Sequence, residues 1–193
     1  MARTRAFDEQ EALDGAMHLF WRRGYGAASL NDLLDATDLS KSSFYETFGN
    51  KRDLLLAALK RYDESPMAAL IEPLRRPDPG RAQIEQTFRN VVQHALSEEG
   101  QRGCFVNNCL CEIGAQDPEI RKAAREVLDS LEGALANAVA NGQKNGSVTS
   151  QEKPRATARF LVNTLSGINV AAKWKPGKAA LDDIVRVALR ALD

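Results

Sequence analysis

Apolar residues recur at spacings of three and four along most of this chain, and few segments alternate with a period of two. The first spacing places apolar side chains on one face of an α-helix, whereas a half-buried strand requires strict alternation. The pattern therefore predicts an all-α fold.

Four helices are expected before residue 63. The first covers about residues 9–23 and ends at Gly24. Ser29, Ser40 and Asn50 each precede one of the next three, where their side-chain oxygens can accept free backbone N–H groups. Asp32 completes a capping box with Ser29. The expected core of this unit is Leu13, Met17, Phe20, Leu33, Leu39, Phe44 and Phe48.

A break is expected at Ser65-Pro66 and again in residues 73–80, which hold three prolines and one glycine. The residues between are partly apolar, so we expect a structured joint rather than a flexible linker. We place a domain boundary here. Residues 1–64 would form a first helical domain, and residues 65–193 a second, larger helical domain.

The second half predicts further helices of similar pattern. One carries the stripe from Ile84 to Ala95, and a short one holds about residues 105–113. Asp117-Pro118 is a strong helix start, since the aspartate can cap and proline suits the first helical position. A helix near Pro154 follows a polar loop, and the last helix follows Pro176-Gly177.

Composition sets limits on the class of protein. The chain has 193 residues, 44% hydrophobic content and a formal net charge of zero, from 26 basic and 26 acidic residues. DNA binding would then depend on local placement of charge. The N-terminus lacks an apolar signal-peptide region, and no apolar run approaches the roughly 20 residues of a membrane span. We expect a cytoplasmic protein without a membrane partner.

Residues 29–55 predict a helix-turn-helix, in which two short helices flank a tight turn and a third helix opens on Lys51-Arg52. The middle helix has a small, hydroxyl-rich face that can approach base edges, and Lys51 lies at a helix N-terminus, which favours phosphate. A plain helical hairpin with a solvated polar face is the alternative. The candidate DNA contacts are Arg3, Arg5, Ser29, Lys41, Ser42, Ser43, Tyr45, Thr47 and Lys51.

FWRRGY followed by SLNDLLDATDLSKSSFYETFGNKRDLLLAAL resembles the DNA-binding domain of the TetR family of bacterial transcriptional regulators. The resemblance is dense from Phe7 to Leu59, and Gly103-Cys104-Phe105 with Asp117-Pro118 resembles an AcrR-like branch. It implies base contacts by Lys41, Ser42 and Ser43, and phosphate contacts by Tyr45, Thr47 and Lys51. Asp38 departs from the usual turn glycine but tolerates a left-handed backbone, and Lys153 departs from the usual helix cap.

The resemblance also implies a repressor that binds a palindromic operator on double-stranded DNA as a homodimer. Pairing would use the last two helices, through Leu161, Leu165, Ile168, Ile184, Val185, Ala188 and Leu192. An unknown small effector, apolar or weakly polar, would release the DNA from a pocket in the second domain. Its expected walls are Phe88, Val91, Val92, Cys104, Phe105, Asn108, Leu128, Phe160, Asn163, Thr164, Gly167 and Lys173, although plain core packing would explain the same residues.

The three cysteines, Cys104, Cys109 and Cys111, are too few and too clustered for a disulfide framework. Cys104 at a helix N-terminus, with Lys173 near it, would have a lowered thiol pKa and could sense an electrophile or oxidant. On this hypothesis Cys111 shares its face and Cys109 points elsewhere; the alternative is three buried cysteines.

Other classes of protein find less support. The spacing of the cysteines lacks a paired zinc motif, so we expect no metal and no cofactor. No nucleophile elbow, phosphate loop or zinc-protease motif is present, so we expect no enzyme. A cysteine enzyme built on Cys104 and His94, or a helical adaptor for protein partners, would be the rival from a different class.

Overall fold

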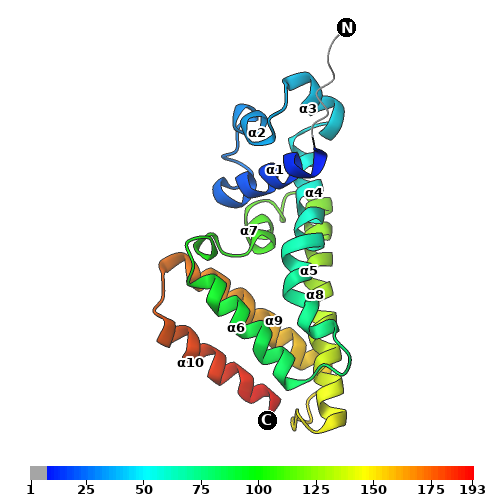
Figure 1. Ribbon diagram of the computed structural model, residues 1–193, viewed down its shortest axis with the longest axis vertical. Coiled ribbons are helices and arrows are strands. Elements are labelled where there is room, and N and C mark those ends of the chain that lie inside the picture. Colours follow the sequence, from blue (N-terminus) through cyan, green and yellow to red (C-terminus); the bar gives the residue numbers. More distant parts are fainter. Residues whose placement is uncertain (1–7) are drawn as a thin grey trace.

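The computed structural model describes residues 8–193, and this part of the chain is helical throughout, as predicted (Figure 1). None of the described helices is both long enough and apolar enough to cross a membrane. The α-helices are α1 (Glu9–Arg23), α2 (Leu30–Thr37), α3 (Lys41–Phe48), α4 (Lys51–Tyr62), α5 (Ala68–Ile71), α6 (Arg81–Ala95), α7 (Phe105–Glu112), α8 (Pro118–Asn145), α9 (Pro154–Ala171) and α10 (Lys178–Ala188).

The first three helices form a small unit at one end of the molecule (Figure 1). Its centre is made of fully buried apolar side chains, which are Ala16, Phe20, Leu33 and Phe44. The predicted caps are present: Ser29 forms a capping box with Asp32, and Ser40 accepts from the backbone N–H of Ser43. These caps bind backbone N–H groups that the helix itself leaves free, so α2 begins directly after Ser29 and α3 directly after Ser40.

The turn between α2 and α3 depends on Asp38, which has a left-handed backbone with φ 52° and ψ 34°. Its N–H donates to the carbonyl of Leu34 and closes α2. Aspartate reaches this conformation at lower cost than most residues other than glycine. The turn therefore forms without the usual glycine, as expected from the sequence.

The expected break at Ser65-Pro66 was wrong. The backbone continues from α4 through a π-helical turn, Asp63–Met67, directly into α5. Proline removes one backbone donor and crowds the preceding turn, and a wider π turn accommodates both without ending the helix. The chain leaves the helical path only after a 3₁₀ turn at Glu72–Arg75. The division at residues 64 and 65 stays a prediction.

The remaining helices form a second, larger layer. Figure 1 shows α4 and α5 running alongside the long helix α8, while α6, α9 and α10 lie side by side at an angle to it. The core continues from the first unit into this layer without a gap, because α1 and α8 both pack against α4. Lys153 gives α9 no side-chain cap, as its sequence suggested.

Candidate nucleic-acid interface and internal cavity

The outward face of α3 is polar and small, and it lies at the end of the molecule opposite the C-terminus (Figure 1). Lys41, Ser42 and Tyr45 are exposed, and Thr47 is half-buried beside them. Phe44 and Phe48 on the opposite face are buried and fix the helix to its neighbours. The predicted contact residues of α3 therefore share the side of the helix that is open to solvent.

Three of the predicted hydroxyl contacts are already engaged within the chain. The Ser42 hydroxyl lies 3.0 Å from Ser40 Oγ. The Ser43 hydroxyl lies 2.9 Å from Ser40 Oγ, and Ser43 is only partly exposed. Ser29 donates its hydroxyl to Asp32 Oδ2 over 2.7 Å. Ser29 caps α2, and the hydroxyls of Ser42 and Ser43 lie against Ser40, the cap of α3, so a DNA contact from any of the three would compete with these bonds. Arg3 and Arg5 lie outside the described residues.

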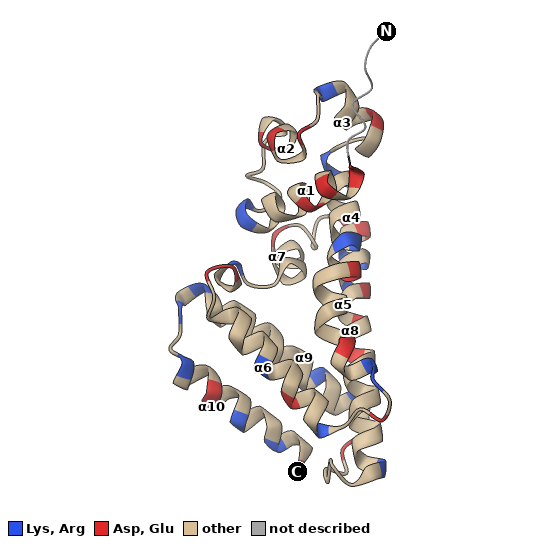
Figure 2. Ribbon diagram, viewed as in Figure 1, with Lys and Arg blue, Asp and Glu red and all other residues tan. Residues whose placement is uncertain are grey.

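Lys51 begins α4, where the Asn50 side chain accepts from the N–H groups of Arg52 and Asp53. Its Nζ lies 4.6 Å above the ring of Tyr25, which is a cation–π contact. Partial burial lowers the pKa of Lys51, and the nearby Glu112 carboxylate acts in the opposite direction. Figure 2 shows basic and acidic positions interspersed along the ribbon, so positive charge is local here, as the zero net charge requires.

Glu112, the last residue of α7, holds the loop between α1 and α2. Its carboxylate accepts from the backbone N–H of Tyr25 over 2.8 Å and from that of Gly26 over 2.7 Å. Hydrogen bonds to a charged acceptor are the stronger kind. This contact joins the helix-turn-helix to the second layer, and no local pattern in the sequence indicated it.

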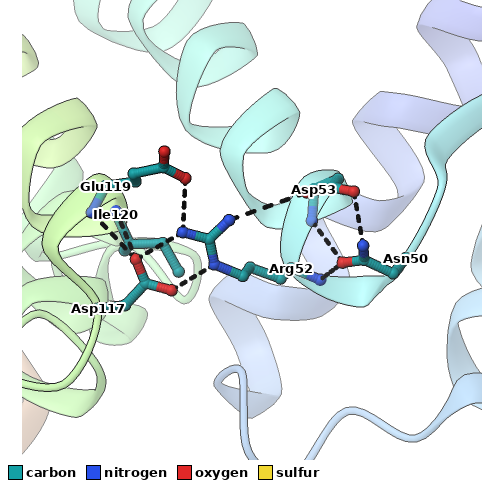
Figure 3. A network of polar contacts seen from close by, with 6 residues as sticks. All are labelled: Asn50, Arg52, Asp53, Asp117, Glu119 and Ile120. Atoms are coloured by element: carbon teal, nitrogen blue, oxygen red, sulfur yellow. Dashed lines mark hydrogen bonds and ion pairs between the residues drawn. The ribbon is translucent and has the colours of Figure 1, made fainter.

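A second joint was also missed by the sequence patterns. Arg52 donates from Nε and from one terminal nitrogen to the two carboxylate oxygens of Asp117, and the same terminal nitrogen lies 2.6 Å from Glu119 Oε2 (Figure 3). Asp117 also caps α8 through the N–H groups of Glu119 and Ile120. The hydrogen bonds from Arg52 lower the pKa of Asp117 to about 2. The start of α4 is thereby fixed to the start of α8.

The third joint is made by Trp21 near the end of α1. Its indole N–H donates to the carbonyl of Gly103 over 2.9 Å. The indole packs edge-on against Tyr62, with 5.3 Å between ring centroids. Gly103 itself has φ 73°, and a Cβ there would lie 2.8 Å from Lys173 Cε. The segment before α7 is therefore held between α1 and the end of α9.

A cavity of about 280 Å³, partly open to solvent, lies between the two layers. It is mostly apolar and includes three of the predicted wall residues, Val91, Cys104 and Leu128. Phe88 and Phe105 are instead fully buried core residues, and Val92 faces a separate groove between α6 and α10. Asn108 is occupied by Lys173 Nζ at 2.6 Å and by the carbonyl of Arg102.

The two faces of α9 were assigned the wrong way round. Leu161, Leu165 and Ile168, predicted to pair with a second copy, are buried within the subunit, and Leu165 lines the cavity. The residues predicted as pocket walls on the same helix point outward or are only partly covered, namely Phe160, Asn163, Thr164 and Gly167. Helical periodicity separates the two faces of α9 but does not show whether the subunit's own core or a second copy covers the apolar one.

Helix α10 shows the same division of faces. Ala188 and Leu192 were predicted to pair with a second copy but are buried in the subunit, while Val185 is half-buried beside the α6–α10 groove. Ile184 and Val187 remain exposed. Phe160 and Val170 on α9 and Trp174 in the turn after it are exposed as well, and we call these five side chains the α9–α10 face.

The environment of the cysteines differs from the one predicted. Burial raises the pKa of the Cys104 thiol, although Lys173 lowers it slightly, so the predicted fall in pKa was wrong. Lys173 does lie near this segment, as expected. Cys109 is buried with Cys104 and burial raises its pKa to about 12, whereas Cys111 is exposed, the reverse of the expected sides. Cys104 precedes α7, so counting helical turns from it misplaces the others.

Cys104 and His94 both line the cavity, but no hydrogen bond joins them in the described part of the chain. The Cys104 sulfur is instead 3.8 Å from the hydroxyl of Tyr62. A thiol whose pKa burial raises, with no base bonded to it, is poorly suited to nucleophilic catalysis. The arrangement is that of a helix-turn-helix joined to a helical layer with a cavity, the architecture of a DNA-binding regulator.

Comparison with known proteins agrees with this class. Residues 12–58 match the family of bacterial regulatory proteins called the tetR family, and residues 80–188 match the tetracyclin repressor-like C-terminal domain. The chain therefore belongs to the TetR family and is a helix-turn-helix transcriptional regulator. The AcrR-like branch stays a prediction.

Individual relatives span the whole chain. It is 30% identical over 194 residues to the uncharacterized HTH-type transcriptional regulator YezE of Bacillus subtilis, covering 100% of each. It is 28% identical to the transcriptional repressor ComR of Escherichia coli, covering 96% of this chain and 88% of ComR.

Among solved structures, a cysteine mutant of the TetR family regulator CifR bound to a 26-base-pair operator DNA has a TM-score of 0.85 and 30% identity, over 99% of this chain and 100% of that one. The reduced form of NemR from Escherichia coli has the same fold, with a TM-score of 0.86 and 22% identity, over 95% of this chain and 96% of that one.

Proposed function

We propose that this regulator is a repressor that binds a palindromic operator as a homodimer and is released by a small molecule in the cavity. The observation that carries the proposal is the outward polar face of α3, held between capped ends at the tip of the molecule. A recognition helix of this size reads only a few base pairs, so two copies are needed for a specific site.

The exposed residues of α3 fall into two groups, those that would contact base edges and those that would contact phosphates. Lys41 and Ser42 would contact base edges, since a lysine can donate to guanine acceptors and a serine fits closely. Tyr45 and Thr47 would donate to phosphate oxygens. Ser29 would serve mainly through the cap of α2, and Ser43 through its contact with Ser40, the cap of α3, with any phosphate contact as an additional role. Lys51 would bind phosphate beside the N-terminus of α4.

The α9–α10 face would form the dimer interface. It carries five of the seven exposed large apolar side chains of the described residues, and exposed apolar patches mark interaction sites. In a two-fold dimer the same face of each copy would meet its counterpart. CifR bound to operator DNA shares the fold along almost the whole chain, which supports a similar use of the helix-turn-helix here.

The first test is fluorescence-anisotropy titration against the DNA upstream of the gene that encodes the chain. We expect Lys51→Ala to weaken binding at least about tenfold and to reduce the salt slope by about one for each subunit. Lys60→Ala is the matched control, because Lys60 lies on the same helix, is exposed and pairs only with Glu64 in the described residues. Equal losses in the two variants, or affinity no higher than for random DNA, would contradict the proposal.

A second candidate is release of DNA by modification of Cys104. Its sulfur lines the cavity, Lys173 lies beside Gly103, and CifR has been solved as cysteine mutants and NemR as a reduced form. Because burial raises the thiol pKa, only a neutral electrophile or oxidant that enters the cavity would react. Operator release that is equal in the unmodified chain and in Cys104→Ser would refute this candidate.

A further inference from the structure

The cavity is shared by the two layers of the fold, including the helix-turn-helix unit. Trp21 comes from α1, Tyr62 from α4 and Leu70 from α5, while the opposite wall comes from α6, α8 and α9. Any molecule held there touches the first unit directly. The chemistry of the lining therefore indicates which ligand the cavity can bind, and its position indicates how binding can affect the helix-turn-helix unit.

The lining excludes charged ligands. No lysine, arginine, aspartate or glutamate lines the cavity. Burial raises the pKa of Tyr62 and of Cys104, so neither carries a negative charge at neutral pH. Apart from His94, no side chain of the lining could pair with a carboxylate, and none could pair with an ammonium group, so a charged group placed here would lose its hydration with little compensation, which is costly.

Three asparagines supply amide groups to a mostly apolar wall, which also includes His94 and Ser166. Asn90 accepts from Gln86 at its amide oxygen, which leaves its NH₂ group free of partners in the described chain. Asn169 donates to the carbonyl of Leu165, which leaves its amide oxygen. Within the same described residues, the side chain of Asn107 forms no hydrogen bond. The cavity thus offers both donors and acceptors to one polar group.

The volume limits the size of the ligand. An engineered apolar cavity of about 150 Å³ holds benzene, and this one measures about 280 Å³. The space suits one substituted ring or two fused rings. Trp21 and Tyr62 provide aromatic surfaces against which a ring can pack.

We propose that the cavity binds a neutral one- or two-ring molecule with a hydroxyl or carbonyl group, which the asparagine amides hold while the ring packs on Trp21. The proposal rests on the proposed function and names the chemistry of its effector. Trp21 carries the effect of binding to the reading unit, because its indole is at once a cavity wall, part of α1 and a donor to Gly103.

The ligand class is tested with three probes of one shape and different charge: benzyl alcohol, benzoate and benzylammonium. The two tryptophans give two indole N–H signals in NMR spectra, and the signal missing from Trp21→Phe identifies Trp21. We expect benzyl alcohol to shift the Trp21 signal at concentrations at least about tenfold lower than either ion requires. Equal or tighter binding of an ion, or no shift of the Trp21 signal with any probe, would overturn the proposal.

The asparagine contacts are tested by comparing benzyl alcohol with toluene. The preference for the alcohol should fall about threefold or more in Asn107→Leu, because one hydrogen bond contributes on this order. Taking the ratio of two ligands in one variant removes any general effect of the substitution on folding. A ratio equal to that of the unsubstituted chain would overturn the role of the amides.

The link through Trp21 is tested by the operator affinity at saturating benzyl alcohol. We expect the affinity of the unsubstituted chain to fall about fivefold or more, within the usual range of coupling between sites. In Trp21→Phe, which keeps a ring but loses the bond to Gly103, the fall should be less than half as large. A fall of equal size, or none in the unsubstituted chain, would overturn the link. Absence of operator binding without probe would instead contradict the proposed function, and the NMR titration would still decide the ligand class.

Discussion

Gly15→Ala tests the close packing of α1 against α2, because the added methyl group should lower stability although alanine favours a helix more than glycine does. A Cβ on Gly15 would lie 2.0 Å from the carbonyl oxygen of Ala36, where α1 crosses α2. Ordinary carbon–oxygen contacts need about 3.3 Å, so the two helices would have to move apart by roughly 1.3 Å. Alanine is favoured over glycine in a helix by about 1 kcal/mol, but overpacking of this kind costs about 1–3 kcal/mol or more. We expect Gly15→Ala to lower the free energy of unfolding by about 1–2 kcal/mol.

The matched control is Gly133→Ala in α8, where an added Cβ would meet nothing within 4 Å. The same change there should raise stability by up to about 1 kcal/mol, since only helix propensity acts. Urea unfolding followed by far-UV circular dichroism measures both variants, at one protein concentration because association would add to apparent stability. A Gly15→Ala variant as stable as Gly133→Ala would refute the steric reasoning and the close crossing of α1 and α2.

Three further predictions concern the joints and the dimer. Arg52 holds the pKa of Asp117 in the folded chain near 2, against 3.8 for the ordinary side chain. The stability that this pair contributes is therefore present above pH 3.8 and is lost as the pH falls towards 2. Asp117→Asn should flatten that part of the acid-unfolding curve, and an unchanged curve would contradict the joint. Glu112→Gln should weaken operator binding several-fold by anisotropy, because the 25–26 loop loses a charged acceptor; affinity equal to that of Glu126→Gln, an exposed control, would argue against this role. Val187→Glu should give a monomer in sedimentation velocity, since it buries a charge in the α9–α10 face; a dimer of unchanged stability would place the interface elsewhere.

The sequence predicted the helix-turn-helix closely, because its signals are local. Ser29, Ser40 and Asn50 begin the helices where capping chemistry places them, and the left-handed turn at Asp38 follows from the tolerance of aspartate. The family resemblance was confirmed by both family matches. The break at Pro66 was wrong because packing of α4 and α5 along α8 outweighs the local cost of a proline.

Features that depend on contacts between distant residues could not be read from the pattern. Arg52 meets Asp117 across 65 positions, and Glu112 reaches the N–H of Tyr25 across 87. For α9, periodicity identified the apolar set Leu161, Leu165 and Ile168 but not whether the subunit's own core or a second copy covers it. The direction of the Cys104 pKa shift also depended on burial, which a helix N-terminus by itself does not reveal.

The three joints, made by Trp21, Glu112 and Asp117, all lie at the ends of α7 or in the turn that follows it. This arrangement explains how a small cavity can influence a distant reading helix. Trp21 bonds to Gly103 just before α7, Glu112 at the end of α7 holds the 25–26 loop, and Asp117 lies in the turn that follows. Cys104 and Asn107 near the start of the same helix line the cavity. A ligand that displaces α7 therefore acts on both of its ends together, and each end is bonded to the unit that carries α3.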